Sequence, residues 1–325
     1  MKLFVWNIRR LGSPRAVQAL LLLYKKHLPD LMFLVETKVD NCVMERIRVK
    51  LGFVGKLVVN SEGRSGGLCL FWSKNTVVDL LSFSRFHIDV KISSVCNKTW
   101  RFSGFYGHPD PSQRHHAWTM LRRLHGMYQL PWLVAGDFNE ILEESEKQGG
   151  VIRALILMSN FRGALDSCGL EDLGFSEPRF TWSNRRDGDN LILERLDRCV
   201  GNFEWSQIFS VVMVRHLGFW RFDHRPLVMT FDRAVAAPSA PADRGRRRRH
   251  FEACWANEEE CVNLIRNTWQ TVHQPASLHS VVEHVGTCSI KLNHWSRTRQ
   301  FIMRREIDRK RRELDAASAL IHRGS

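Results

Sequence analysis

The sequence predicts an α/β protein in which two packed β-sheets are covered by helices, over residues 1–232. Strand-like and helix-like segments interleave along this part of the chain. Short runs that are apolar at every position, such as Leu31–Val35 and Trp132–Ala135, are typical of strands buried on both faces. Of the 325 residues, 44% are hydrophobic and 25% are charged. This ordinary globular usage excludes a mainly disordered, collagenous or low-complexity chain.

The first elements follow from local signals. Lys2–Trp6 predicts a strand. Ser13 is suited to cap the next helix and Pro14 to begin it, because proline fits the first helical position. The apolar segment Ala16–Tyr24 is followed directly by Lys25-Lys26-His27, without a cleavage site, so an amphipathic helix is favoured over a signal peptide. No apolar run approaches the roughly 18–20 residues of a membrane span. We therefore expect an intracellular protein without membrane contact.

Alternation and flanking polar residues predict the remaining elements up to residue 232. The expected helices are Gln113–Met127 and Arg153–Ser167. The expected strands are Leu68–Trp72, Val77–Leu81, Phe86–Ile92, Trp100–Tyr106, Thr181–Trp182, Ile192–Val200, Val211–Val214 and Leu227–Phe231.

A change of composition near residue 233 predicts a domain boundary. Residues 233–250 are rich in Ala, Pro and Arg, which is typical of a linker, and residues 251–325 read as a helical tail. Within the tail, Glu258–Gln270 is amphipathic and Thr298–Leu320 predicts a long basic helix. The run Arg246, Arg247, Arg248 and Arg249 is compatible with a nuclear-import signal, a phosphate-binding patch or a solvated linker.

Charge and cysteine usage narrow the class of function. The formal net charge of +14 favours an anionic partner. The eight cysteines are widely spaced, with no C-x-x-C pair and no Cys/His cluster at zinc spacing. The sequence therefore argues against a zinc-binding module and favours free buried thiols.

Four polar clusters follow expected strands, where loops project side chains toward a common point in layered α/β folds. They contain Asn7, Glu36, the pair Asp137 and Asn139, and the pair Asp223-His224. Each cluster alone is typical of an ordinary turn. Together they supply carboxylates for Mg²⁺, an acid/amide pair that can orient water, and a histidine that can meet phosphate charge.

These residues stand in motifs that resemble the endonuclease/exonuclease/phosphatase superfamily. Within it, the chain is most similar to the apurinic-type endonuclease domain of plant non-LTR (LINE-type) retrotransposons. The matching motifs, in their order along the chain, are LFVWNIRRLGSPRAV, PDLMFLVETK, GRSGGLCLFW, FYGHP, WLVAGDFNEIL, CGLEDLG, FTWSNRR, ERLDR and DHRPLVM. The resemblance implies a four-layered α/β sandwich, which is two packed β-sheets flanked by helices. It also implies that residues 251–325 resemble the region upstream of a reverse transcriptase. The sequence itself shows no polymerase-like carboxylate motif.

The resemblance also implies roles for single residues. Glu36 is expected to be the principal Mg²⁺ ligand, Asp223 to lie beside the metal, and Asn7 to position the phosphate and the carboxylates near the metal. Asp137 is expected to orient or deprotonate the attacking water, and Asn139 to bond the same water or a phosphate oxygen. Tyr106 is expected to contact the phosphate. His224, paired with Asp197, is expected to stabilise the phosphate charge or to assist the leaving group. Trp182 and Asn184 lie on the loop that family members use against the DNA groove, although Trp182 is equally suited to core packing.

Two positions depart from the pattern of the family. Phe222 replaces a serine before the Asp-His pair, which removes a hydroxyl group from the site. Arg10 replaces a glycine, and we expect strain there because glycine in such loops often adopts a positive φ. Both changes are compatible with a decaying copy of a mobile element.

The resemblance predicts a Mg²⁺-dependent endonuclease that nicks one strand of duplex DNA and leaves a 3′-hydroxyl, with Mn²⁺ as a possible substitute. Its partners would be DNA and also element RNA, in the nucleus. One alternative is a phosphomonoesterase of the same superfamily, although Asn139-Glu140-Ile141 differs from the Asn-Tyr-Arg of the inositol branch. The other alternative is a decayed remnant that binds nucleic acid without cleaving it. Target preference and oligomeric state are not predicted.

Overall fold

The computed structural model describes residues 1–62, 65–94, 99–176, 178–209, 211–219, 222–232 and 258–270, with single residues and pairs between 281 and 310. The chain divides into two compact units, Met1–Gly245 and Arg246–Ser325. The predicted linker 233–250, with its four arginines, and most of the predicted helix 298–320 lie outside the described residues. In the second unit, the predicted amphipathic helix is α6 (Glu259–Gln270).

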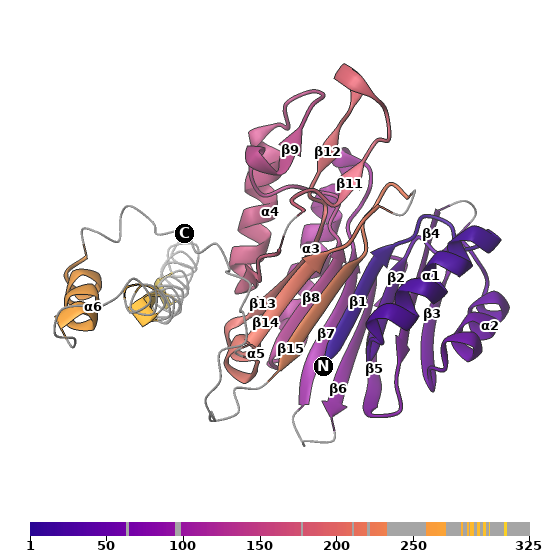
Figure 1. Cartoon of the computed structure of the whole chain (residues 1–325), viewed down its shortest axis with the longest axis horizontal. Helices are drawn as coiled ribbons and strands as arrows, with labels where there is room; N and C mark the ends of the chain where they lie inside the picture. The colour runs from indigo at the N-terminus through magenta and orange to yellow at the C-terminus, as the bar shows by residue number, and fades with distance from the viewer. Residues whose placement is uncertain are drawn as a thin grey trace, which may run out of the picture. The chain divides into compact units, whose positions relative to one another are not determined.

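The first unit is the predicted four-layered sandwich, with two β-sheets between two layers of helices (Figure 1). The first sheet has the order β14 (Val211–His216), β15 (Leu227–Asp232), β1 (Lys2–Asn7), β2 (Leu31–Val35), β4 (Ser65–Trp72), β3 (Gly55–Glu62). The second sheet has the order β10 (Leu170–Asp172), β13 (Asp197–Asn202), β8 (Trp132–Asp137), β7 (Thr99–Tyr106), β6 (His87–Ser94), β5 (Thr76–Ser84). A small third sheet contains β11 (Trp182–Ser183), β12 (Leu193–Glu194) and β9 (Lys147–Gln148).

Helices cover the outer face of each sheet. The first sheet packs against α1 (Pro14–His27) and α2 (Asn41–Leu51), and the second against α3 (Arg114–Met127) and α4 (Leu155–Ser167). The remaining helices are α5 (Phe203–Ile208) and the short 3₁₀ helices Pro111–Gln113, Glu144–Glu146 and Gly188–Asn190. As predicted, Ser13 caps α1 by accepting a hydrogen bond from the Ala16 amide, and Pro14 is its first residue. None of the helices among the described residues has the length and apolar character to cross a membrane.

Alternating side chains explain why β1 and β2, in the middle of the first sheet, are almost entirely apolar. On β1, Leu3 and Val5 face the core between the two sheets, whereas Phe4 and Trp6 face the helices. All four side chains are almost completely buried. A strand with helices on one side and a second sheet on the other has no solvent face, which favours apolar residues in the centre of β1 and β2.

Each sheet contains a pair of parallel strands, and these two pairs position the site. β1 and β2 are parallel and are connected by α1, and β7 and β8 are also parallel. All other pairings between these strands and their neighbours are antiparallel. The carboxyl ends of a parallel pair lie at the same edge of a sheet, and ligand sites in α/β folds collect there.

The structure contains five strands and helices that the sequence did not predict, namely β3, β9, β10, α2 and α5, and it divides one predicted strand. The expected strand Ile192–Val200 is divided into β12 and β13, because the amides of Leu196 and Asp197 donate to the Thr181 hydroxyl at 3.0 Å instead of to a neighbouring strand. The helix α2 was not predicted, although Asp40 caps it by accepting from the Val43 amide.

Candidate active site

The two parallel strand pairs bring four polar side chains together. Asn7 ends β1 and Glu36 follows β2, whereas Tyr106 ends β7 and Asp137 ends β8. The Asn7 side-chain amide donates to Asp137 Oδ2 at 2.9 Å and to Glu36 Oε1 at 3.3 Å. The Tyr106 hydroxyl also donates to Glu36 Oε1, at 2.8 Å. Four residues predicted for the site, from both sheets, therefore form one connected network.

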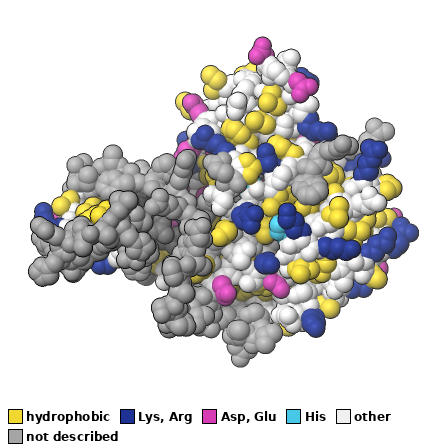
Figure 2. All heavy atoms as spheres, viewed as in Figure 1, with side chains coloured by type: hydrophobic (Ala, Val, Ile, Leu, Met, Phe, Trp, Pro, Cys, Tyr) yellow, Lys and Arg dark blue, Asp and Glu magenta, His cyan; other side chains and the backbone are white. Residues whose placement is uncertain are grey.

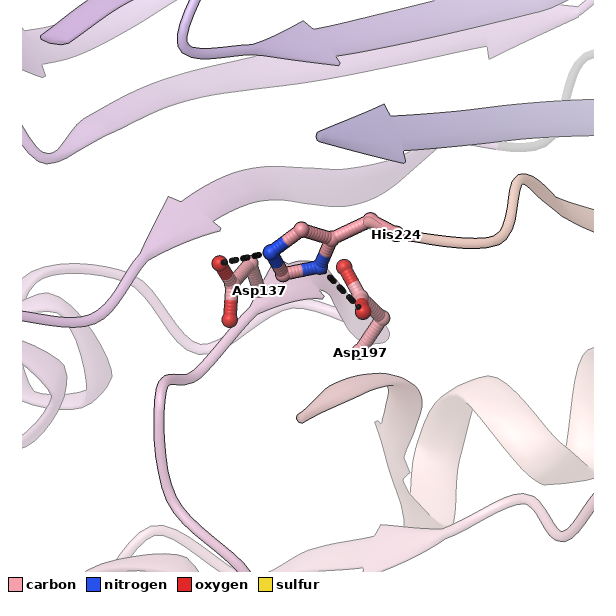
Figure 3. Close-up of side chains that lie close together, drawn as sticks. All are labelled: Asp137, Asp197 and His224. Atoms are coloured by element: carbon pink, nitrogen blue, oxygen red, sulfur yellow. Dashed lines mark hydrogen bonds and ion pairs between the residues drawn. The ribbon is translucent and has the colours of Figure 1, made fainter. Parts of the chain in front are cut away.

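The His224 ring lies between two carboxylates (Figure 3). Its Nδ1 is 2.8 Å from Asp197 Oδ2, and its Nε2 is 3.8 Å from Asp137 Oδ2. Asp137 and Asp197 face each other across the register of β8 and β13. All three residues are buried, with exposed fractions of 4% or less. Among the described residues, these three form a group whose possible metal-binding atoms all lie within 4.8 Å of one another.

Neighbouring groups hold the histidine in place. The Trp6 indole N–H donates to the His224 carbonyl at 3.2 Å, and Trp182 pairs with His224 as an isolated β-bridge. Phe222 packs edge-on against Trp6 with ring centroids 4.8 Å apart. The ring that replaces the expected serine is thus used for packing beside the histidine.

Burial and mutual charge shift the pKa values of this group in a way that suits proton transfer. Burial, reinforced by the charge of Asp197, raises the pKa of Asp137 to about 7. Burial alone would lower the pKa of His224, but the negative charges of Asp197 and Asp137 outweigh it and raise this pKa to about 10. A protonated histidine can donate a hydrogen bond from each ring nitrogen. The shifts place a carboxylate that can accept a proton next to an imidazolium that can donate one.

The carboxylates expected to hold the metal are each paired with a cation from this chain. Lys38 Nζ lies 2.6 Å from Glu36 Oε2, and the Arg9 guanidinium contacts Asp223. Hydrogen bonds from Lys38 and Tyr106 overcome the effect of burial and lower the pKa of Glu36. Carboxylate and amide oxygens are the donors that Mg²⁺ takes. Glu36, Asp223 and Asn7 fit a divalent cation by their chemistry, because its charge can replace that of Lys38 and Arg9.

Asn139 is held differently from its predicted role. Its backbone amide donates to Asp137 Oδ1 at 2.8 Å, and its side-chain amide donates to the Gly107 carbonyl at 2.9 Å. Asn139 thus orients the Asp137 carboxylate through its backbone, while its side chain ties the ends of β7 and β8 together.

Backbone strain is concentrated around this site. Among the described non-glycine residues, seven have a positive φ, and apart from Leu28 all of them lie at the site or line the pocket beside it. They are Arg9, Arg10, Glu36, Lys38, Asn139 and Arg185. Such conformations cost about 1–3 kcal/mol each and persist where the surrounding structure holds them. Arg10, with φ of 128°, has the glycine-like conformation expected at this position.

A family model described as "Endonuclease/Exonuclease/phosphatase family" matches residues 4–253. The chain belongs to the endonuclease/exonuclease/phosphatase family. Enzymes of this family are nucleases and phosphatases that depend on a divalent metal. A comparison with curated proteins gives no match.

Solved structures with the family fold resemble this chain at low identity. The 3′-5′ exonuclease NExo from Neisseria meningitidis is 17% identical, with a TM-score of 0.55 over 71% of this chain and 100% of the other. The AP endonuclease LMAP from Leishmania major is 16% identical, with a TM-score of 0.56 over 72% and 88%. The endonuclease domain of TRAS1, a telomere-specific non-LTR retrotransposon, is 15% identical, with a TM-score of 0.51 over 73% and 99%. At these identities the likeness shows the fold.

Trp182 and Asn184, predicted to face DNA, line a pocket beside this family site. Trp182 is half-buried and also packs against the buried cluster of Ile141, Met158 and Leu196, which is the packing role considered for it. The arginines Arg246–Arg249 lie outside the described residues.

Sequence reasoning missed three contributors to the site of this family member. Arg9 and Lys38 neutralise the predicted metal ligands, and the Thr181 hydroxyl holds the backbone at Asp197. Arg9 and Lys38 each stand two positions after a predicted site residue, Asn7 and Glu36. That spacing was a usable signal, because a turn after a strand returns such a residue to the same site. Nothing in the sequence near Thr181 indicates its role.

Proposed function

We propose that this protein is a Mg²⁺-dependent endonuclease that nicks one strand of duplex DNA. The observation that carries this proposal is the buried His224 ring between Asp197 and Asp137, directly beside the network of Asn7 and Glu36. The arrangement combines a carboxylate with a pKa near neutrality and a protonated histidine in one place. A general base with such a pKa works efficiently at ordinary pH.

The chain's own residues divide the reaction between them. Asp137 accepts a proton from the attacking water, whose oxygen forms the new bond to phosphorus. The P–O3′ bond breaks and O3′ takes up a proton from solvent, which leaves a 3′-hydroxyl on one side and a 5′-phosphate on the other. His224, held by Asp197, places its positive charge next to the phosphate as negative charge develops there. Asn7 orients Asp137 and Glu36, and Tyr106 fixes Glu36.

A divalent cation would be held by Glu36, with Asp223 and Asn7 beside it. When bound, it supplies charge neutralisation at the phosphate oxygens and at the leaving oxygen. We expect Mn²⁺ to substitute for Mg²⁺, because both are taken by oxygen ligands.

Surface charge supports DNA as the partner. Lys and Arg side chains are spread over the face that carries α1 and α2, with few acidic side chains among them (Figure 2). The net charge of the chain, +14, also favours an anionic partner such as DNA. Phosphate contacts of this kind give an affinity that falls as salt rises.

The motif text also supports an origin in a LINE-type retrotransposon of a plant, with a nuclear place of action and element RNA as a further ligand. The order and spacing of these motifs support this origin, and Arg246–Arg249 supports nuclear import. We also propose that the endonuclease domain ends at residue 232 and that a linker separates it from a helical tail beginning at residue 251.

The test uses supercoiled plasmid with purified full-length protein and Mg²⁺. We expect conversion to open circles that is lost with EDTA, and nicks that a DNA polymerase can extend because they carry a 3′-hydroxyl. Release of inorganic phosphate from monoesters without nicking would contradict the proposal in favour of a phosphomonoesterase.

Two observations favour a second candidate, a remnant that binds DNA without cleaving it. Arg10 has a glycine-like backbone conformation in the loop that carries Arg9, and Arg9 and Lys38 cover the predicted metal ligands. Salt-sensitive DNA binding by folded protein, with no nicking in Mg²⁺ or Mn²⁺, would select this candidate.

A further inference from the structure

A strongly basic pocket opens beside the candidate active site. Its volume is about 510 Å³. Arginines enter it from the loop after β1 and from the loop between β11 and β12, and the Trp182 and Phe222 rings form part of its wall. Among the described residues that line it, Asp223 is the sole acidic one. The four arginines are Arg9, Arg10, Arg185 and Arg186.

This composition fits a phosphodiester group with an adjacent base. Arginine forks match the geometry of phosphate oxygens, and aromatic rings offer stacking surfaces to bases. Arg10, Arg185 and Arg186 are exposed at the surface, so a phosphate can reach them. The pocket and the His224 site share the segment that contains Asp223, so one stretch of DNA can occupy both.

Arg9 belongs to the pocket and to the metal site at once. Its guanidinium contacts Asp223, which raises the pKa of Arg9, and the charge of Glu36 adds to this effect. The Arg9 side chain is 58% exposed, whereas that of Asp223 is 9% exposed. The exposed guanidinium of Arg9 is within reach of an incoming anion, whereas the buried carboxylate of Asp223 needs a cation beside it. Arg9 can therefore exchange Asp223 for another anion when a metal cation takes its place at Asp223.

We propose that Arg9 couples DNA binding to metal binding. In the free protein Arg9 neutralises Asp223 and competes with a cation for it. In the complex Arg9 turns to a DNA phosphate in the pocket, which leaves Asp223 to the metal. This inference rests on the proposed function in taking DNA as the ligand. Coupling between two sites is reciprocal, so the metal also strengthens DNA binding.

The test measures Mn²⁺ affinity by the electron paramagnetic resonance signal of free Mn²⁺, with and without a short duplex oligonucleotide. All proteins carry His224→Asn, which prevents cleavage during the titration. We expect DNA to tighten Mn²⁺ binding about tenfold, within the usual range of coupling between sites. We expect Arg9→Gln to tighten Mn²⁺ binding without DNA and to abolish the further effect of DNA.

Matched controls separate this coupling from general electrostatics. Arg46→Gln removes one positive charge from an exposed position on α2. It should retain the full DNA effect, and a titration of DNA alone corrects for Mn²⁺ bound to the duplex. Thermal melting checks that Arg9→Gln is folded. If it is not folded, Arg9→Lys replaces it, and we expect a reduced DNA effect because lysine lacks the two-pronged contact.

Two results would overturn the inference. One is an equal DNA effect in the protein with Arg9 and in folded Arg9→Gln. The other is Mn²⁺ affinity that DNA does not change in the protein with Arg9. Nicking is scored separately on the protein without His224→Asn, so its absence would contradict the proposed function while leaving the coupling result to stand on its own.

Discussion

Two buried charged clusters in the first unit treat their carboxylates in opposite ways. The Arg198 cluster consists of Glu146, Asp172, Arg195 and Arg198, and the His224 cluster consists of Asn7, Asp137, Asp197 and His224. In the Arg198 cluster, Arg198 lies 2.8 Å from Glu146 and 2.9 Å from Asp172, and Arg195 contacts the same two carboxylates at 2.7 and 2.9 Å. Two permanent cations therefore balance two carboxylates.

The pKa values show the consequence of this balance. Burial would raise the pKa of Asp172, but the charges of Arg195 and Arg198 lower it far below its ordinary value. In the His224 cluster, two carboxylates share one titratable cation, and burial raises the pKa of Asp137 to about 7. The difference teaches that fixed cations hold a buried aspartate ionised, whereas burial beside a second carboxylate brings its pKa close to neutrality.

Adjacent residues of one strand supply the two clusters. Asp197 and Arg198 are consecutive on β13, and successive side chains of a strand point to opposite faces. Asp197 meets His224 on one face, whereas Arg198 meets Glu146 and Asp172 on the other. A substitution at either position therefore tests one cluster with little direct effect on the other.

The largest expected effect is the loss of nicking in His224→Ala. We expect the rate to fall about 10³-fold or more, because the group that supplies positive charge at the phosphate is removed. Plasmid nicking measures the rate, and a gel-shift assay should show DNA affinity close to that of the unchanged protein. A folded variant that nicks at the normal rate would disprove the assignment of His224.

The Arg198→Met substitution should cost stability instead. Removing one partner of a buried ion pair typically costs about 3–5 kcal/mol, because the remaining carboxylates are left buried and unpaired. The free energy of unfolding in urea measures this, with Arg46→Met as the control at an exposed position. Equal stability of both variants would show that Glu146 and Asp172 do not depend on Arg198.

The site was more predictable than the Arg198 cluster for a physical reason. Asn7, Glu36 and Asp137 follow apolar strands, and strand ends meet at one edge in a layered fold. Arg198, in contrast, pairs with Glu146 across 52 positions, and no local pattern announces such a partner. The pairing of Arg9 with Asp223 spans 214 positions, so the spacing from Asn7 could place Arg9 at the site but could not identify Asp223 as its partner.

The strands and helices also differ in how well the local sequence predicts them. Leu31–Val35 was predicted with its observed bounds, because a strand buried on both faces needs an unbroken apolar run. The break between β12 and β13 depends on the Thr181 hydroxyl, which lies 15 positions away in the chain, so the local sequence read as one strand. The Asp40 cap and the buried Met44, Ile47 and Leu51 were a usable signal for α2.

The pH dependence of nicking should reflect the His224 cluster alone. Activity needs ionised Asp137 and protonated His224, so it should rise as pH passes about 7 and fall as pH passes about 10. The two apparent pKa values describe the coupled group and not single residues, and a bound cation lowers the pKa of Asp137. In Asp197→Asn both limits should move to lower pH, because the negative charge that raises both pKa values is gone. A pH–rate profile with unmoved limits would contradict this account.

The smallest expected effect concerns Arg10. Glycine adopts a φ of 128° without strain, so Arg10→Gly should stabilise the protein by about 1 kcal/mol after the larger entropy of the unfolded chain is deducted. Arg46→Gly is the matched control, because an exposed helical position should lose about 0.5–1 kcal/mol instead. Urea denaturation measures both, and a loss of stability in Arg10→Gly would show that the loop is not strained at this residue.

The central claim is that the His224 cluster performs chemistry while the Arg198 cluster holds the fold. The most direct measurement compares Asp137→Asn with Asp172→Asn, in plasmid nicking with Mg²⁺ and in thermal melting at pH 8. We expect Asp137→Asn to lose nicking and to melt at or above the temperature of the unchanged protein, because a poorly compensated buried charge is removed. We expect Asp172→Asn to melt lower and, while folded, to nick normally. Loss of nicking in folded Asp172→Asn, or normal nicking in Asp137→Asn, would contradict the account.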